Sequence, residues 1–494
     1  MVRISKISKQ DIPEEVRKVA EVIENAGYEA YLVGGCVRDL LLGREPKDWD
    51  FTTNARPETI VGLFPETYQN NDFGTVGVVN ETENERLKVV EVTPYRLESG
   101  YSDARRPDSV TFSDTLSEDL KRRDFTMNAI AYSISHETTI DEFDGLRDLE
   151  EKRVRAVGQA SERFAEDALR ILRAVRFAVE LGFVIEAETM EAIILNVHNL
   201  GRISKERIRD EFVKILNSDS PMQGIVLLEK LGMLQYVAPD LLRGIGVEQN
   251  KAHAYHVYEH LLRTLQHAAD KKWPLHLRLA ALFHDVSKPE TRRWSEEKGT
   301  WTFHGHEVVG SRVTRKILTG LKFPRETVDL VTNLVRWHMF FSDPDQITLS
   351  AVRRTIQNVG KDYIEDLLNL RVCDRIGTGR PKEQPFRFRK YKAMVDEAMR
   401  DPISVKMLGI DGRRIMEVTG EKPGPKIGYV LHALLEEVLD DPAKNTAEYL
   451  EKQAVELMRL EEHELEKRGE QGKEKREKEE EEALHAIKQK HKVV

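Results

Sequence analysis

Residues 28–53 have the sequence YEAYLVGGCVRDLLLGREPKDWDFTT, and this stretch decides the fold of the N-terminal part of the chain. A short β-rich run ends at Gly34-Gly35, a helical segment follows, and DWDFTT at 48–53 is the next predicted strand. Glycines between a strand and a helix let backbone N–H groups approach a phosphate closely, and the helix N-terminus adds a favourable dipole. The stretch therefore predicts a phosphate-binding turn.

Charged side chains accompany this turn. Arg38 lies on the first turns of the predicted helix, where its guanidinium fork can hold phosphate oxygens. Asp48 and Asp50 are two apart on a predicted strand, so both carboxylates should face one side and hold the same pair of hard cations. Glu91, on a later strand, is a third candidate. Each feature alone is more often an ordinary turn or strand end, but their succession favours a nucleotidyl-transfer site.

The surrounding sequence predicts the fold class. Residues 14–27 indicate an amphipathic helix, and residues 74–80 and 86–93 are β-rich runs that can pair as neighbouring strands. Strands and helices alternate up to about residue 145, so the first unit is α/β. From residue 151 helical periodicity dominates, with no strand expected after VRAVG at 154–158. We therefore expect a multidomain α/β + α protein.

Composition limits the class of protein. The chain has 494 residues, more than one ordinary core holds, with 40% hydrophobic and 33% charged residues. The expectation is three or four packed units. No apolar run approaches the ~20 residues of a membrane helix, and the N-terminus has no apolar signal core. Only Cys36 and Cys373 occur, so we expect a reducing, cytoplasmic setting and no membrane partner. The net charge of −9 says little about nucleic acid, because basic residues are clustered.

Three blocks carry a family resemblance. YLVGGCVRDLLLG with KDWDF, RRDFTMNAIA at 122–131 and EDALRILRAVRF at 166–177 resemble the nucleotidyltransferase superfamily. The branch is that of the bacterial CCA-adding enzymes and poly(A) polymerases, the class II tRNA nucleotidyltransferases. The resemblance implies a polymerase β-like head and an enzyme that uses ATP and CTP to add CCA to tRNA.

The resemblance also implies residue roles. Asp48 and Asp50 would bind two Mg²⁺ and carry the catalysis, with Glu91 as the least certain ligand. The other matched positions would bind the nucleotide: Gly34, Gly35, Arg38, Arg123, Asp124, Asn128, Glu166, Asp167, Arg170, Arg173 and Arg176.

Asp167 and Arg170 suggest how bases are chosen without a template. At i and i+3 of one predicted helix they would share a face. Cytosine and adenine both offer an amino donor beside a ring-nitrogen acceptor, which suits a carboxylate beside a guanidinium. Uracil and guanine reverse this pattern, at a cost of ~1–3 kcal/mol for each unpaired buried group. Glu166 would orient the arginine. The ordinary alternative is a surface ion pair.

The blocks do not distinguish CCA addition from poly(A) addition or from A-addition alone. The polar segment 95–120 predicts a mobile loop and resembles the loop that these enzymes use to switch from C to A. GTVGVVN at 74–80 resembles CCA-adding enzymes, because poly(A) polymerases usually carry a basic, aromatic stretch there. The loop argues against an enzyme that adds only C, and the GTV form favours CCA addition over poly(A) addition.

A second set of residues indicates a metal site. His260, the pair His284-Asp285 and Asp374 form an ordered H…HD…D series, and imidazole with carboxylate suits a divalent transition metal. His256 should share a helix face with His260, while His306 and His338 are candidates for an extended or two-metal version. The series resembles the HD phosphohydrolase domain, which implies a second activity on phosphate esters. The alternative is a structural domain that helps to hold RNA.

These observations predict five parts and leave several rivals open. The rivals are a poly(A) polymerase, an A-adding enzyme, an HD phosphohydrolase with a vestigial transferase, and a non-catalytic RNA-binding protein. The oligomeric state is open. The parts are a catalytic head (1–150), a helical neck for nucleobase and RNA binding (151–245), an HD domain (250–380), a helical tRNA-binding body (381–460) and a charged tail (461–494).

Overall fold

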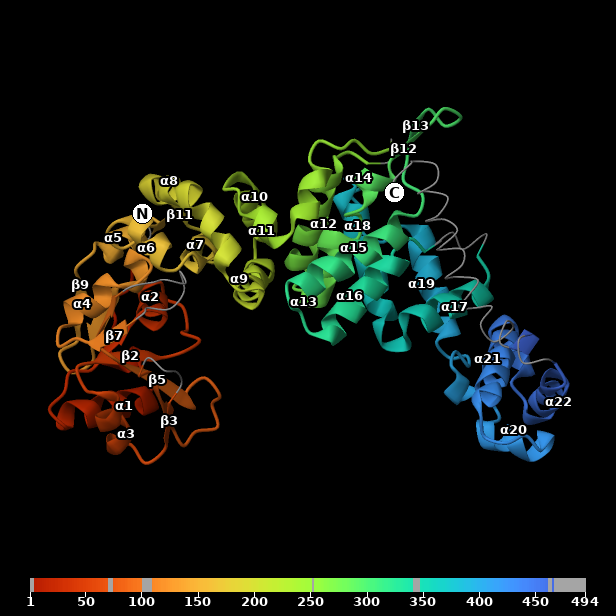
Figure 1. The fold of residues 1–494 in the computed structure, drawn as a ribbon, viewed down its shortest axis with the longest axis horizontal. Helices are drawn as coiled ribbons and strands as arrows, with labels where there is room; N and C mark the ends of the chain where they lie inside the picture. The colour runs from red at the N-terminus through yellow and green to blue at the C-terminus, as the bar shows by residue number, and fades with distance from the viewer. Residues whose placement is uncertain are drawn as a thin grey trace. The chain divides into compact units, whose positions relative to one another are not determined.

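The chain folds into two compact units, Met1–Val237 and Ala238–Val494. A computed structural model describes residues 4–69, 74–99, 109–250, 253–340, 347–460 and 464–465 (Figure 1). The predicted charged tail, apart from residues 464–465, and the centre of the predicted loop 95–120 lie outside these residues. Among the described residues no helix has the length and apolar character needed to cross a membrane.

The first unit contains a seven-stranded sheet in the order β3-β4-β5-β2-β1-β8-β9. β2 and β5 run parallel, and the other neighbours are antiparallel. The predicted pairing of residues 74–80 with 86–93 is confirmed as β4 with β5. The strands are β1 (Tyr31–Val33), β2 (Asp50–Thr53), β3 (Thr67–Gln69), β4 (Val76–Val79), β5 (Val89–Pro94), β8 (Ile130–Ser133) and β9 (Thr138–Asp141). β6 (Arg96–Ser99) and β7 (Ser109–Phe112) form a separate pair.

Short helices surround this sheet. The amphipathic helix predicted for residues 14–27 is confirmed as α1 (Glu14–Asn25), and the helix after the glycine pair as α2 (Gly35–Leu41). The others are α3 (Pro57–Leu63), α4 (Leu116–Lys121), the 3-10 turn η2 (Thr126–Asn128) and α5 (Gly145–Glu150). A methyl group at Gly145 would lie 2.3 Å from the Thr126 carbonyl oxygen, so only glycine lets α5 pack this closely on η2.

The expectation that Asp48 lies on a strand is wrong. β2 begins at Asp50, and Asp48 lies in the bend before it. The reason is the register: Phe51 pairs with Leu32 of β1, so pairing ends where β1 turns away at Gly34. Gly34 has a φ of +81°, which a residue with a side chain rarely adopts. The two carboxylates are therefore brought together by a bend rather than by strand alternation.

The rest of the first unit is helical, as expected. The helices are α6 (Ala160–Glu166), α7 (Leu169–Leu181), α8 (Ala187–Asn196), α9 (Lys205–Asn217), α10 (Pro221–Lys230) and α11 (Leu234–Val237). One further strand was not expected: β11 (Val184–Ile185) pairs in parallel with β10 (Arg153–Val154). With two residues it is too short to produce an alternating pattern.

Asp167 and Arg170 do not share a helix, contrary to the prediction. α6 ends at Glu166, and Asp167 is extended, with φ −138° and ψ 103°. The Asp167 carboxylate accepts a hydrogen bond from the Leu169 N–H at 3.0 Å, at the start of α7. Aspartate favours such positions because its side chain replaces a helical backbone acceptor.

Among the residues that the structure describes, the second unit is built from helices and one hairpin of β12 (Arg293–Ser295) and β13 (Thr300–Thr302). The hairpin corrects the expectation that no strand follows residue 158, because strands of three residues are too short to produce a clear alternating pattern. α12 packs against α13 and α18, and α15 packs against α16. The helices are α12 (Val257–Asp270), α13 (Leu275–Phe283), α14 (Lys288–Thr291), α15 (His306–Gly320), α16 (Arg325–Trp337), α17 (Leu349–Val359), α18 (Ile364–Gly377), α19 (Phe386–Ala398), α20 (Gly412–Thr419), α21 (Pro425–Asp440) and α22 (Ala447–Met458).

Candidate functional sites

Three carboxylates gather at the glycine turn of the first unit. The parallel register of β2 and β5 places Glu91 directly opposite Asp50. A methyl group at Gly34 would lie 3.9 Å from Asp50 Oδ2, and one at Gly35 would lie 3.9 Å from Asp48 Oδ1. The backbone of the glycine pair is therefore close to both aspartates. A site that binds phosphate through backbone N–H groups and cations through carboxylates requires this arrangement.

The charge at this place fits divalent cations. Burial, followed by the neighbouring Asp48 and Glu91 carboxylates, raises the pKa of Asp50 to about 7, and Arg123 only partly opposes them. Carboxylates crowded in this way are stabilised by a hard cation that binds several of them. The three residues therefore fit the Mg²⁺ ions that the sequence implies.

The RRDFTMNA block joins the head to α7 through buried and partly buried hydrogen bonds. Arg38 Nη1 donates to Asn128 Oδ1 at 2.9 Å, and Asn128 Nδ2 donates to Asp124 Oδ1 at 3.0 Å. Arg173 Nε of α7 then donates to Asp124 Oδ2 at 2.7 Å. Burial alone would raise the pKa of Asp124, but Arg173 and Asn128 hold it well below its usual range. Four predicted nucleotide-binding residues therefore form one network.

Two arginines near this network have different environments. Arg176 is buried, pairs with Glu180 at 3.0 Å and Glu211 at 2.7 Å, and lies 3.7 Å from the centre of the Phe177 ring. These contacts stabilise the helices, and its nucleotide contact stays a prediction. Arg123 Nη2 instead donates to Asp119 at 3.0 Å, while a methyl group at Gly34 would lie 3.3 Å from its Nη1.

Sequence reasoning missed Asp119. Its fully buried carboxylate accepts hydrogen bonds from Arg122, Arg123 and the Thr52 hydroxyl. Burial would raise the pKa of Asp119, but the two guanidinium groups lower it below its ordinary value. Its spacing, three and four residues before Arg122 and Arg123, was the available signal, but the polar segment 95–120 was expected to be a loop, whereas the structure has α4 at Leu116–Lys121.

The residues expected to read the base have separate partners. Arg170 Nη1 donates to Glu166 Oε2 at 2.6 Å, consistent with the role expected of Glu166. Arg207 of α9 instead forms a two-pronged pair with Asp167, at 2.6 and 3.2 Å. Arg207 is a further residue that sequence reasoning did not place at this site, because the pair joins positions 40 residues apart.

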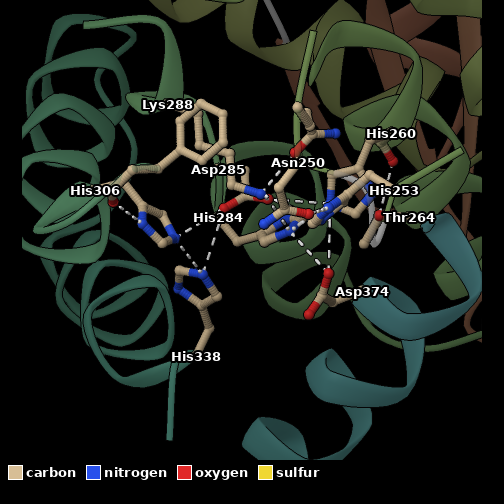
Figure 2. Close-up of polar contacts among 12 residues, drawn as sticks. Asn250, His253, His260, Thr264, His284, Asp285, Lys288, His306, His338 and Asp374 are labelled. Carbon is tan, nitrogen blue, oxygen red and sulfur yellow. Dashed lines mark hydrogen bonds and ion pairs between the residues drawn. The ribbon is translucent and has the colours of Figure 1, made fainter. Parts of the chain in front are cut away.

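The HD-type series forms a buried cluster in the second unit (Figure 2). His260 Nε2 lies 3.0 Å from His284 Nε2, 3.1 Å from Asp285 Oδ2 and 3.4 Å from Asp374 Oδ1. His284 Nε2 lies 3.2 Å from Asp285 Oδ2 and 3.7 Å from Asp374 Oδ1. Metal–nitrogen bonds of ~2.0–2.1 Å separate neighbouring ligands by about 3.0–3.4 Å, so these atoms fit one cation.

Electrostatics supports a cation at this cluster. Burial disfavours an imidazolium, yet Asp285 and Asp374 raise the pKa of His284 to about 9. The expectation for His256 is wrong, because it is exposed at the N-terminal cap of α12. His253, which sequence reasoning did not select, joins His260, Asp285 and Asp374 in a group with metal-ligand spacing.

A cavity of ≈ 390 Å³ lies in the first unit, and a cavity of ≈ 1220 Å³ lies in the second. Different residues line the two cavities. The larger is lined by Asp285, Asp374 and the arginines Arg371, Arg375 and Arg380. Lys288 Nζ lies 2.5 Å from Asp285 Oδ2 and is buried rather than on the surface. The cluster therefore opens into a space that attracts anions.

Three family models match successive stretches of the chain. Residues 30–155 match the Poly A polymerase head domain, residues 182–244 the probable RNA and SrmB-binding site of polymerase A, and residues 257–376 the HD domain. The CCA-adding enzyme of Levilactobacillus brevis is 33% identical over 449 residues, which cover 88% of this chain and 96% of that protein.

Solved structures show the same architecture. The crystal structure of the Bacillus stearothermophilus CCA-adding enzyme in complex with CTP is 27% identical, with a TM-score of 0.62, and the match covers 91% of this chain and 98% of that one. The Thermotoga maritima CCA-adding enzyme complexed with tRNA shares the fold, at 20% identity and a TM-score of 0.53 over 92% and 100% of the two chains. These likenesses confirm the expected fold class.

Replacing Asp50 by Asn should stabilise the chain at high pH. The folded-state pKa of about 7 lies above the ordinary value, so the folded wild type keeps this proton while the unfolded chain loses it. The free energy of unfolding of the wild type should therefore fall between about pH 4 and pH 7. Above pH 7, the free energy of unfolding of Asp50→Asn should exceed that of the wild type by at most about 4 kcal/mol. Urea unfolding in EDTA from pH 4 to pH 8 measures the difference.

The exposed Glu83→Gln is the matched control and should show no such dependence on pH. A wild type that is at least as stable as Asp50→Asn at pH 8 would contradict the charge crowding that we assign to this site.

Proposed function

This chain belongs to the family of CCA-adding enzymes, and we propose that it adds C, C and A to the 3′ end of tRNA without a template, using CTP and ATP. The observation that carries the proposal is the gathering of Asp48, Asp50 and Glu91 against the Gly34-Gly35 turn. Two CCA-adding enzymes were solved in complex with CTP or with tRNA, and their matches to this chain cover 98% and 100% of their own chains.

The transferase chemistry is divided between cations and protein groups. Two Mg²⁺ held by Asp48 and Asp50, with Glu91 beside them, would activate the RNA 3′-hydroxyl and neutralise the α-phosphate. The N–H groups of the glycine turn approach the triphosphate. Arg123 supplies charge next to the turn, and its Nε is buried without a hydrogen-bond partner among the described residues. Asp124 and Asn128 hold Arg38 in place.

Base selection follows from the donors and acceptors of Asp167 and Arg170. The carboxylate accepts from the amino group of cytosine or adenine, and the guanidinium donates to the ring nitrogen. Arg207 occupies one side of the Asp167 carboxylate, but each oxygen accepts more than one hydrogen bond, so an acceptor remains for the base. Glu166 positions the Arg170 guanidinium from the other side.

The cluster in the second unit supports a second activity, hydrolysis of phosphate esters. His260, His284, Asp285 and Asp374 would hold a divalent transition metal, and this ion would supply a Lewis acid for water and the phosphate. The arginines of the cavity would bind the phosphate oxygens. A domain that only holds RNA would not need buried ligand atoms converging on one point.

A tRNA transcript that lacks CCA distinguishes the transferase functions. With Mg²⁺, CTP and ATP we expect C, C and A to be added, followed by a stop, on a gel with single-nucleotide resolution. Asp48→Ala should lower the rate by at least ~10³-fold, because electrostatic stabilisation of the phosphoryl group is lost. The exposed Glu83→Ala is the control.

Other product patterns favour the rivals. A long ladder of A would make the chain a poly(A) polymerase, and addition of A only to transcripts ending in CC would make it an A-adding enzyme. Extension that survives Asp48→Ala would remove the catalytic assignment.

Arg170→Ala should weaken discrimination between bases. Losing the guanidinium removes the donor that suits C and A and disfavours U and G. The ratio of kcat/KM for CTP over UTP should fall by about 10- to 100-fold, which corresponds to ~1–3 kcal/mol. Single-nucleotide addition gives this ratio independently of the fraction of active protein. Arg202→Ala, an exposed arginine of the same helical part, should leave it unchanged, and an unchanged ratio in Arg170→Ala would contradict the proposed role.

The two activities should be separable by mutation. Asp285→Asn should abolish Mn²⁺- or Co²⁺-dependent hydrolysis of bis(p-nitrophenyl) phosphate and 2′,3′-cyclic AMP but keep CCA addition. Asp48→Asn should do the reverse. Release of p-nitrophenol and extension of tRNA measure the two activities in the same preparations. Hydrolysis that is absent in the wild type with every divalent metal would favour the structural role of the second unit.

A further inference from the structure

We propose that Phe386 is a stacking surface for a nucleobase in the large cavity of the second unit, so that this cavity binds a nucleoside phosphate by its base as well as by its phosphate. The inference rests on the proposed hydrolysis of phosphate esters at the HD-type cluster and deepens it. It names the residue that recognises the part of the substrate farthest from the reacting phosphate.

The cavity is much larger than a phosphate group requires. Its volume is ≈ 1220 Å³, whereas pockets of about 300–1,000 Å³ already bury most of a drug-sized molecule. Buried residues of the HD-type cluster form one part of the lining: Asp285, His306, His338 and Asp374. A phosphate bound at these residues therefore leaves most of the cavity for an organic group of the substrate.

Phe386 offers that group an apolar face. It begins α19, lines the same cavity and is 71% exposed, which makes it the most exposed of the large hydrophobic side chains among the described residues. Its ring has no aromatic or cationic partner in the part of the chain that the structure describes. Met339, which is 54% exposed, lines the cavity as well. Exposed apolar side chains that gather in one cavity indicate a ligand-binding surface.

The other aromatic rings of the lining are less accessible. Trp301 of β13 is covered by the Arg292 guanidinium, 3.6 Å from the ring centre, and its ring meets that of Trp294 at 5.2 Å. Three phenylalanines of the lining are buried: Phe303, Phe340 and Phe388. These rings form the wall of the cavity, and Phe386 is the ring with a free face.

The charges of the lining select an anion that carries a flat group. Arg371, Arg375 and Arg380 line the cavity together with Phe386. Arg375 Nε also donates to the Lys382 carbonyl oxygen at 2.6 Å, which fixes the segment that leads to α19. Guanidinium groups bind phosphate oxygens, and an aromatic ring stacks on a planar heterocycle. A nucleoside phosphate combines both groups, whereas a sugar phosphate has no flat apolar face.

Stacking also determines how selective this site is. Every nucleobase has a π-face, so a phenylalanine ring accepts all of them with little preference. The cavity of the second unit should therefore accept all four nucleosides. This differs from the base selection that we propose for Asp167 and Arg170 in the first unit.

Hydrolysis of two substrates by the full chain separates the base from the phosphate. One is 2′,3′-cyclic AMP, and the other is methyl riboside 2′,3′-cyclic phosphate, which has the same reacting group but no base. In both, water adds to phosphorus and one P–O bond to the ribose opens, which leaves a ribose hydroxyl and a phosphate monoester. With Mn²⁺, Phe386→Ala should lower kcat/KM for cyclic AMP by about 5- to 150-fold, the factor for one lost base stack.

This loss should appear in KM, with kcat retained, because stacking far from the phosphate contributes equally before and during the reaction. Hydrolysis of the substrate without a base should be unchanged. Phe386→Trp should restore kcat/KM for cyclic AMP, since tryptophan keeps a stacking ring. Leu195→Ala, which removes a side chain of similar exposure (70%) in the first unit, is the matched control. The cyclic phosphates of the other three nucleosides should follow cyclic AMP in each variant.

An equal loss for both substrates in Phe386→Ala, or an unchanged kcat/KM for cyclic AMP, would overturn the base subsite and leave the proposed hydrolysis intact. If the wild type hydrolyses neither substrate with Mn²⁺, Co²⁺ or Zn²⁺, the proposed hydrolysis fails, and binding decides the subsite. Cyclic AMP is then not consumed, and it should quench the tryptophan emission of Phe386→Trp more strongly than that of the wild type. Equal quenching in the two proteins would overturn the base subsite as well.

Discussion

The ion pair between Arg173 and Asp124 is the contact that joins the two parts of the candidate transferase site. Arg173 lies on α7 and Asp124 lies in the head, and their side chains meet at 2.7 Å. A partly buried ion pair is stabilised when further hydrogen bonds satisfy its charges, and here Asn128 donates to Asp124 and accepts a hydrogen bond from Arg38. The contacts therefore connect residues that we propose to bind phosphate in the head with the helical part that carries the residues proposed to read the base.

The second unit places two buried carboxylates among residues that can bind a metal ion. Asp285 and Asp374 are buried among histidines, where carboxylates are stable only when compensated. Lys288 and Arg371 each neutralise one oxygen, at 2.5 and 2.7 Å. The oxygens that remain lie near imidazole nitrogens, with Asp374 Oδ1 3.4 Å from His260 Nε2 and Asp285 Oδ1 3.1 Å from His306 Nε2. In both units the carboxylates are crowded where they can bind cations, and arginines lie next to them for phosphate oxygens.

The two sites nevertheless suit different metals and steps. The first offers only carboxylates beside a glycine turn, which are hard ligands for Mg²⁺ and a triphosphate. The second offers imidazoles in excess of carboxylates, a donor set for transition metals that activate water. The same chain thus combines a site that forms phosphodiester bonds with a candidate site that hydrolyses phosphate esters, and each has its own ligands.

The sequence by itself determined the family, the α/β head followed by helices, and the residue types of both candidate sites. Local patterns suffice for these, because glycine pairs, Asp-x-Asp and HD series occupy short stretches. Only the tertiary structure decided which residues meet. The bend at Asp48, the break at Asp167 and the pairs of Arg207 with Asp167 and of Asp119 with Arg123 depend on contacts between elements. His253, rather than His256, joins the cluster for the same reason: helical spacing gives a face, but the start of α12 and its packing decide which histidine lies near the other ligands.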